Sequence, residues 1–390
     1  MEIKNRIILK RGKEQSVLRF HPWVFSGAVE KIEGNPVSGD WVNIYDYKNN
    51  FLGAGHYQQS SITARILSFQ EMIPGIDFWK IKLSEALNAR RNIGLPQEKV
   101  TNVFRLVHGE GDGLPGLVID VYDKVAVIQS HSSGMHKDRN LIAQALKEIM
   151  GEEITAIYYK SENDKESGEY LIGESTVPVV VSENGTLFKV NWVEGQKTGF
   201  FIDQRDNRQL LMKYAYGKKV LNTFCYTGGF SVYALKAGAE LVHSVDSSKS
   251  AIGLTDENVR LNFRDEKINH ESFPDDVFKF LEENKNQYNL IILDPPAFAK
   301  HRDAKSNAMK GYQRLNHIAL KNIMPGGIIF TFSCSQVINR ELFYNTIVSA
   351  AILAKRKVRV LHHLSQAPDH PVSIFHSEGE YLKGLVLEVD

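Results

Sequence analysis

Three side chains that could do chemistry each follow an apolar, strand-like run of residues. Cys334 lies in a Ser-Cys-Ser sequence, Asp294 opens an Asp-Pro-Pro sequence, and Asp246 precedes two serines. A cysteine thiolate is a nucleophile that can form a covalent intermediate. A carboxylate can accept hydrogen bonds from hydroxyl groups. If the strands are parallel, their carboxyl ends meet at one sheet edge, where ligands bind, so these side chains are expected to share a site.

A turn with paired glycines precedes Asp246, with Gly228 lying 18 residues before it. Gly228 and Gly229 would let the backbone approach a ligand closely, and Asp246 would then accept hydrogen bonds from the two hydroxyls of a ribose. The glycines do not form the G-x-G-x-x-G fingerprint, which argues against NAD. Two alternatives stay open: an ordinary strand-to-helix turn for the glycines, and a helix N-cap for Asp246.

The other two side chains also have plainer explanations. Two successive prolines after Asp294 fix the backbone and favour a rigidly held carboxylate over a solvated loop residue. Cys334 could instead be a small buried apolar residue, which is a common role for cysteine. Cys225, in the turn with the paired glycines, is the rival nucleophile and is expected to be structural.

The elements that must position these residues alternate between strand and helix from about residue 200 onward. This alternation predicts an α/β domain with a parallel, doubly wound sheet. A last apolar run over 382–389 follows without a full helix and could pair antiparallel at the sheet end. The other strand-like runs cover 220–224, 241–245, 290–293, 327–332 and 358–361.

The first half of the chain has two different patterns. Residues 1–75 are short alternating runs, with strands predicted at 42–45 and 62–67, and they indicate a small β-barrel or sandwich. Residues 76–190 form a predicted α+β domain that begins with a helix capped by Asp77. In that domain we predict strands at 117–122, 125–128, 154–159, 177–181 and 186–193, and a helix over about 135–150. The predicted domains are therefore 1–75, 76–190 and 191–390.

Composition excludes several classes of protein. The 390 residues are 43% hydrophobic and 24% charged, which excludes a disordered or fibrous chain. Two cysteines cannot form a disulfide framework. The N-terminus has no signal-peptide pattern, and no apolar run of about 18 residues predicts a membrane span. We expect a cytoplasmic protein with reduced thiols, no membrane association and no metal site.

Several motifs together resemble one family, the RlmI-like bacterial 23S rRNA cytosine-C5 methyltransferases, over essentially the whole chain. The Gly-Gln-Lys-Thr-Gly-Phe-Phe sequence is the most specific of them, whereas Asp-Pro-Pro occurs in many methyltransferases. The resemblance implies an N-terminal PUA-like domain, a central α+β domain and a C-terminal Rossmann-like class I methyltransferase domain. The motifs cover 109–117, 195–208, 224–230, Asp246, 276–278, 294–296 and 369–371.

The resemblance also implies the cofactor and partners. S-adenosylmethionine would be the methyl donor, 23S rRNA the substrate and a second copy of the chain a partner. The implied cofactor-binding residues are Gln204, Arg205, Asn222, Phe224, Tyr226, Gly228, Asp246, Ser247, Asp276, Asp294 and Pro295.

Cytosine chemistry agrees with Cys334 as the nucleophile, the role that the resemblance assigns to it. A thiolate that adds to C6 turns the ring into an enamine, and C5 can then attack the methyl group. By resemblance, Asp294 would orient or protonate the ring at N3. Ala297 and Phe298 stand where some related enzymes carry a second cysteine, so the group that accepts the C5 proton is unidentified. Two alternatives stay open: methylation of a purine nitrogen, and an inactive methyltransferase fold that only binds RNA.

Basic residues gather in two segments, although the net charge is only +1. The segments 1–20 and 300–321 each hold six basic residues (lysine or arginine). The first segment has two acidic residues and the second has one. Phosphate binding is the functional interpretation, and a solvated surface or, for Trp23, a core position is the alternative. The predicted RNA-binding residues are Lys10, Arg11, Trp23, Lys300, Arg302, Lys305, Lys310 and Arg314.

Overall fold

The chain divides into two compact units in a computed structural model that describes residues 3–97, 99–160, 168–264, 266–298 and 305–390. Each unit is built from three separate segments of sequence. Unit 1 comprises Met1–Val181, Val190–Ile202 and Pro368–Gly379. Unit 2 comprises Ser182–Lys189, Asp203–Ala367 and Glu380–Asp390. The predicted domain boundaries at residues 75 and 190 stay a prediction.

A six-stranded sheet forms the N-terminal part of unit 1. Its strands run in the order β2-β6-β5-β4-β1-β3, and the alternating apolar residues, such as Val42, Ile44 and Ala64, fill its core. The strands predicted at 42–45 and 62–67 are confirmed. The elements are β1 (Asn5–Leu9), α1 (Gln15–Leu18), β2 (Trp23–Phe25), β3 (Val29–Glu33), β4 (Trp41–Tyr45), β5 (Phe51–Tyr57) and β6 (Ile62–Ser68).

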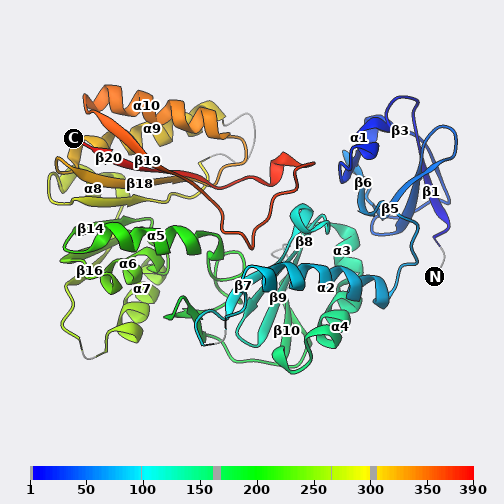
Figure 1. Cartoon of the computed structure of the whole chain (residues 1–390), viewed down its shortest axis with the longest axis horizontal. Helices are drawn as coiled ribbons and strands as arrows, with labels where there is room; N and C mark the ends of the chain where they lie inside the picture. Colours follow the sequence, from blue (N-terminus) through cyan, green and yellow to red (C-terminus); the bar gives the residue numbers. More distant parts are fainter. Residues whose placement is uncertain (1–2, 98, 161–167, 265, 299–304) are drawn as a thin grey trace. The chain divides into compact units, whose positions relative to one another are not determined.

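A five-stranded sheet in the order β11-β10-β9-β8-β7 forms the rest of unit 1, with α2 and α4 packed on it (Figure 1). The sequence predicted Asp77 as the cap of α2. This prediction is wrong, because the helix already begins at Ile76. Asp77 instead lies in the first turn and pairs with Lys80. The elements are α2 (Ile76–Asn92), β7 (Val103–His108), β8 (Leu117–Tyr122), β9 (Val125–Ser130), α3 (Ser133–Lys137), α4 (Arg139–Met150), β10 (Ala156–Lys160) and β11 (Glu169–Ile172).

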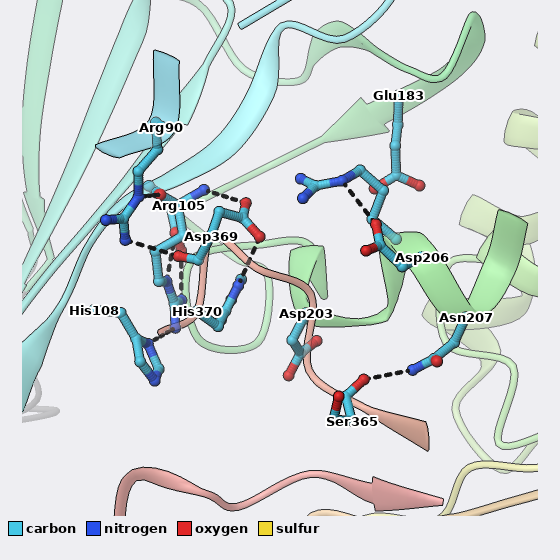
Figure 2. A network of polar contacts seen from close by, with 12 residues as sticks. Arg90, Arg105, His108, Glu183, Asp203, Asp206, Asn207, Ser365, Asp369 and His370 are labelled. Atoms are coloured by element: carbon cyan, nitrogen blue, oxygen red, sulfur yellow. Dashed lines mark hydrogen bonds and ion pairs between the residues drawn. The ribbon is translucent and has the colours of Figure 1, made fainter. Parts of the chain in front are cut away.

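The segment Pro368–Gly379 is tied to unit 1 by a buried polar network (Figure 2). The carboxylate of Asp369, which is fully buried, accepts a hydrogen bond from the backbone N–H of Arg105 at 3.0 Å. Arg90 donates to the backbone carbonyl of Asp369 at 2.8 Å, and His370 contacts the Asp369 carboxylate at 3.1 Å. A short stretch from late in the sequence thereby becomes part of the N-terminal unit.

Unit 2 is a doubly wound α/β domain with helices on both faces of a seven-stranded sheet (Figure 1). The strand order is β16-β15-β14-β17-β18-β20-β19, and the first five strands are parallel. The strands are β14 (Lys219–Thr223), β15 (Leu241–Asp246), β16 (His270–Pro274), β17 (Leu290–Leu293), β18 (Gly327–Ser333), β19 (Val358–Ser365) and β20 (Lys383–Val389). The helices are α5 (Arg205–Ala215), α6 (Gly229–Lys236), α7 (Lys249–Asn262), α8 (Val277–Glu283), α9 (Lys305–Asn322) and α10 (Arg340–Ala354).

The last strand of the chain is not at the end of this sheet, contrary to the prediction. β20 is antiparallel, as expected, but it lies between β18 and β19 and pairs with both. Its apolar run is buried because it is a central strand. β19, whose side chains alternate between partly buried and exposed, takes the edge.

Two smaller features complete the described structure. β12 (Val179–Glu183) and β13 (Thr186–Val190) form a two-stranded sheet, and Glu183 makes a buried ion pair with Arg208 of α5. Among the described residues, no helix is both long and apolar enough to cross a membrane. Single-turn 3-10 helices cover Ser26–Ala28, Gly109–Asp112, Gly151–Glu153, Ile202–Gln204 and Ser377–Gly379.

Candidate active site

The parallel register of unit 2 brings the three predicted chemical groups to one sheet edge. Thr223 at the end of β14 is paired with Val245 of β15 and with Leu293 of β17. Leu293 is in turn paired with Thr331 of β18. The residues that follow these four positions, among them Asp246, Asp294 and Cys334, therefore leave the sheet on the same side.

The turn from β14 to α6 has a strained backbone. Phe224, Tyr226 and Gly228 have φ angles of 53°, 47° and 75°, in the left-handed region. A Cβ on Gly228 would lie only 2.7 Å from Cγ2 of Thr255, so glycine is required there for both conformation and space. Left-handed residues that are not glycine cost about 1 kcal/mol each and gather at functional sites. This strain agrees with a functional role for the turn, and the role itself stays a prediction.

Asp246 holds the shape of this turn with its carboxylate. One oxygen accepts a hydrogen bond from the backbone N–H of Tyr226 at 3.0 Å, and the other accepts one from the backbone N–H of Ser248 at 2.9 Å. Ser248, and not Asp246, is the N-cap of α7, since its hydroxyl accepts from the backbone N–H of Ala251. The N-cap alternative for Asp246 is therefore wrong. Ser247, between them, is exposed.

Asp294 is held from α5 as well as by the prolines that follow it. Gln204, the N-cap residue of α5, donates from Nε2 to Oδ2 of Asp294 at 3.0 Å. Asn207 donates in turn to Oε1 of Gln204 at 2.7 Å, which fixes the orientation of the Gln204 amide. Asp294 stays half-buried beside the buried Pro295. The carboxylate is therefore both oriented and accessible.

Cys334 lies beside Asp294 at the end of β18. Its Sγ is 3.9 Å from the carbonyl oxygen of Pro295, and the residue is half-buried. The other thiol, Cys225, is buried against the Thr255 hydroxyl at 3.6 Å. Burial raises the pKa of Cys225 to about 12, which keeps it a neutral thiol at physiological pH. Of the two cysteines, the geometry favours Cys334 as the nucleophile.

Several other predicted cofactor-binding side chains are used by the fold itself. Asn222 is buried and donates to the Ser231 hydroxyl at 2.8 Å. Asp276 caps α8, because its carboxylate accepts from the backbone N–H of Lys279 at 2.9 Å. Arg205 is buried at the start of α5 and lies 3.4 Å from Asp206. Contact with a ligand by these side chains stays a prediction.

Two polar side chains at the same edge were missed by the sequence interpretation. Lys383 opens β20 opposite Ser333, and its Nζ donates to the carbonyl of Ser335 at 2.6 Å. Burial raises the pKa of Tyr312, on α9, to about 12, and the neighbouring Ser333 acts in the opposite direction. The only sequence signal for Lys383 was a lysine at the start of an apolar run. No sequence signal indicated Tyr312.

The predicted RNA-binding residues of the N-terminal segment lie in unit 1. Lys10 and Arg11 are exposed. Trp23 is half-buried, donates from Nε1 to Glu110 at 3.0 Å and packs against His376 with ring centroids 4.3 Å apart. Trp23 is thus neither a core residue nor a freely exposed stacking surface.

The predicted RNA-binding residues of the second basic segment are only partly described. Lys305 and Lys310 lie on α9, half-buried and exposed respectively. Arg314 is exposed, forms an ion pair with Glu282 at 3.4 Å and lies over the Phe278 ring. Lys300 and Arg302 lie outside the described residues.

Comparisons with known proteins cover the whole chain. Residues 7–69 match the family model of a PUA-like domain, and residues 143–373 match that of an S-adenosylmethionine-dependent methyltransferase. A protein of Aeromonas hydrophila named ribosomal RNA large subunit methyltransferase I is 42% identical over 98% of both chains. A protein of the same name from Pseudoalteromonas atlantica is 40% identical over 99% of this chain and 100% of its own.

Solved structures show the same fold. An S-adenosylmethionine-dependent methyltransferase from Streptococcus mutans superimposes with a TM-score of 0.85 at 24% identity, over 100% of both chains. A methyltransferase solved in complex with S-adenosylhomocysteine superimposes with a TM-score of 0.86, also over 100% of both chains. At this identity the likeness is one of fold, and it confirms the fold class that was predicted from the sequence.

Proposed function

Because this chain belongs to the ribosomal RNA large subunit methyltransferase I family of S-adenosylmethionine-dependent methyltransferases, we propose that it methylates C5 of a cytidine in 23S rRNA. The predicted family, methyltransferase class and cofactor are confirmed by the full-length relatives and the family model. The target atom, the nucleotide and the roles of individual residues belong to the proposal. The observation that carries it is the position of Cys334, half-buried beside Pro295 on the edge that also holds Asp246 and Asp294.

The residues at this edge suit the cofactor. The turn over 224–228 holds a left-handed backbone at the end of β14, and Gly228 lets Thr255 of α7 pack closely against it. Asp246 uses one lone pair of each carboxylate oxygen for the turn, and a carboxylate has further acceptor sites for the ribose hydroxyls. When bound, S-adenosylmethionine supplies an electrophilic methyl group on a sulfonium.

Cys334 and Asp294 would act on the cytosine ring. The Cys334 thiolate adds to C6, and the ring becomes an enamine. Its C5 then forms the new bond to the methyl carbon as the methyl–sulfur bond breaks and S-adenosylhomocysteine leaves. A base then removes the proton from C5, and the C6–S bond breaks to return the thiolate and the aromatic ring. Asp294, oriented by Gln204, would give a proton to N3 as C6 is attacked, so that no negative charge builds up on the ring.

The substrate and setting follow from the same assignment. We propose that the PUA-like domain and the basic α9 contact rRNA phosphates and that the target base is extruded from its stack to reach Cys334. The cytoplasm, where ribosomes are made, would then be the working compartment. Homodimer formation, a property of the resembled family, stays a prediction.

The test is a Cys334→Ala variant of the full chain, incubated with S-adenosylmethionine and 23S rRNA. Mass spectrometry of the digested nucleosides should show 5-methylcytidine with the wild type and at least about 1,000-fold less with the variant. Calorimetry should show unchanged S-adenosylmethionine affinity, and Ser349→Ala on α10 is the control for an unrelated substitution. Full activity of the Cys334 variant would refute the covalent mechanism, and a methylated purine would refute the target atom.

A second experiment traps the covalent intermediate. RNA that carries 5-fluorocytidine cannot lose a proton from C5, so the enzyme should remain attached after methyl transfer. Peptide mapping should place the RNA on Cys334 and leave Cys225 unmodified. An adduct on Cys225 would contradict the assignment of the nucleophile.

A further inference from the structure

Lys383 is buried at the end of the sheet where Cys334 lies. It opens β20, whose next four residues are glycine and apolar residues, and it is only 3% exposed. A buried lysine is costly unless its charge is compensated, and lysines are seldom fully buried without a partner. Its position therefore calls for a physical explanation.

The Lys383 side chain is directed at the backbone around Cys334. Lys383 pairs with Ser333 across the ladder of β18 and β20, and its Nζ donates to the carbonyl of Ser335 at 2.6 Å. A second bond goes to the carbonyl of Tyr381 at 2.8 Å. Lys383 thus contacts the residue on each side of Cys334. Both hydrogen-bond acceptors are neutral carbonyls, which supply no counter-charge.

Among the described residues, Glu380 is the carboxylate that acts on Lys383, and it forms an ion pair with Arg340 of α10. Burial lowers the pKa of Lys383 to about 8, and a negative charge on Cys334 is the strongest influence in the opposite direction. Arg340 lowers this pKa further and Glu380 raises it, both more weakly than Cys334.

Within the described part of the chain, Tyr312 of α9 is a further titratable group near Cys334. Its pKa is raised to about 12, mainly by burial, so it is a neutral phenol over the working pH range. The anion that best matches a charged Lys383 is therefore the thiolate of Cys334.

We propose that the ammonium group of Lys383 is the counter-ion that holds Cys334 as a thiolate. Lys383 is then a positioning residue for the nucleophile, and the inference rests on the proposed role of Cys334. A free cysteine has a pKa of about 8.5, so only a few per cent is thiolate at neutral pH. Lowering the thiol pKa by one unit would raise that fraction about tenfold.

The experiment measures the thiol pKa directly, without RNA or cofactor. The full chain is alkylated with iodoacetamide between about pH 5 and pH 10, and peptide mass spectrometry follows Cys334 and Cys225 separately. The alkylation rate of Cys334 rises with pH, and the midpoint of this rise should lie at least about one pH unit below 8.5. A wild-type midpoint at or above about 8.5 would overturn the proposal, whether or not any variant folds.

Variants separate the charge of Lys383 from its hydrogen bonds. Lys383→Met should raise the Cys334 midpoint by about one unit or more, and Lys383→Gln, which keeps a donor without the charge, should do the same. Lys383→Arg should retain part of the lowered midpoint because it keeps the charge. An unchanged midpoint in a folded Lys383→Met protein would contradict the proposal.

Lys236→Met is the matched control. Lys236 also donates to backbone carbonyls, including that of Gly185 at 2.9 Å, but it lies at the end of α6. This variant should leave the Cys334 midpoint unchanged. The same measurement also separates this inference from the proposed function. If the Cys334 midpoint is low and depends on Lys383 but the chain does not methylate rRNA, the proposed function is refuted and the role of Lys383 stands. If the enzyme is active but the pH midpoint of Cys334 alkylation is that of a free cysteine, the role of Lys383 is refuted and the proposed function stands.

Discussion

Gln204 donates a hydrogen bond to the carboxylate of Asp294 at 3.0 Å, although 90 residues separate them in the sequence. The bond joins the start of α5 to the end of β17. Asn207 holds the other end of the Gln204 amide. Asn207 also donates to the carbonyl of Ser365, as Figure 2 shows. Three segments of unit 2 thus fix the orientation of one carboxylate.

Replacing Gln204 should impair turnover more than cofactor binding. Gln204→Leu removes the bond that orients Asp294, and a misplaced catalytic group lowers kcat by about 10- to 100-fold. Steady-state kinetics with rRNA and calorimetry with S-adenosylmethionine measure the two effects. Gln287→Leu, at an exposed position, is the control. Unchanged kcat in Gln204→Leu would show that the bond does not serve the reaction.

Asp246→Asn should weaken S-adenosylmethionine binding. An amide offers one carbonyl oxygen, so one of the two backbone bonds from Tyr226 and Ser248 is lost together with the negative charge. Loss of a charged hydrogen bond should raise the Kd by about 10-fold or more. Isothermal calorimetry measures this, and Asp256→Asn on α7, which bonds Ser272, is the control. Equal affinities for the two variants would argue against a ribose role for Asp246.

Breaking the buried ion pair in unit 2 should destabilise that unit strongly. Arg208 donates two hydrogen bonds to Glu183 at 2.8 and 2.6 Å, and both side chains are almost fully buried. Glu183→Gln would leave the Arg208 charge uncompensated and lower the free energy of unfolding by about 3–5 kcal/mol. Urea unfolding followed by circular dichroism measures the loss.

The pair of exposed Arg359 and half-buried Glu388, 3.1 Å apart, is the comparison for this prediction because it is open to solvent. Glu388→Gln should change the free energy of unfolding by less than about 1 kcal/mol, because solvent screens exposed pairs. A similar loss in both variants would mean that burial does not decide the effect.

Unit 1 should lose stability below about pH 6.5 because of His108. Burial, followed by the positive charges of Arg105, His370 and Arg90, lowers the pKa of His108, and Asp369 opposes them weakly. The folded state therefore keeps His108 neutral, whereas the unfolded chain binds a proton below about 6.5. The stabilisation is present above that pH and is lost as the pH falls, by up to about 1.4 kcal/mol per pH unit.

Tryptophan fluorescence measures this effect selectively, because Trp23, Trp41, Trp79 and Trp192 all belong to unit 1. Urea unfolding is compared at about pH 7.5 and pH 5.5. His108→Gln should flatten the pH dependence, whereas His131→Gln, at an exposed position, should leave it unchanged. If the free energy of unfolding falls equally with pH in the wild type and in His108→Gln, His108 is not the cause of the pH dependence.

The strands of unit 2 were mostly predictable because their apolar runs are long and buried. β16 was missed, since its sequence His-Glu-Ser-Phe-Pro is polar and ends in proline, as an edge strand can be. The place of β20 could not be predicted either. Strand order depends on pairing between residues far apart in sequence, and periodicity carries no information about it.

The candidate site was predictable to the level of the sheet edge. Parallel strands end on the same side, so Asp246, Asp294 and Cys334 could be placed together without coordinates. The use of each side chain was harder to predict. Asp276 caps a helix, and Lys383 reaches the site only because an antiparallel strand from the end of the chain inserts beside β18.

The bond between Asp369 and the backbone N–H of Arg105 has a consequence for how the protein is made. The ribosome synthesises the chain from the N-terminus onward, and most of unit 1 precedes residue 182. That bond nevertheless cannot form until residue 369 has been synthesised, and the central strand β20 of unit 2 comes later still. Neither unit can finish folding before the residues that follow Ala367 are synthesised, so the nascent chain keeps both incomplete over most of its translation.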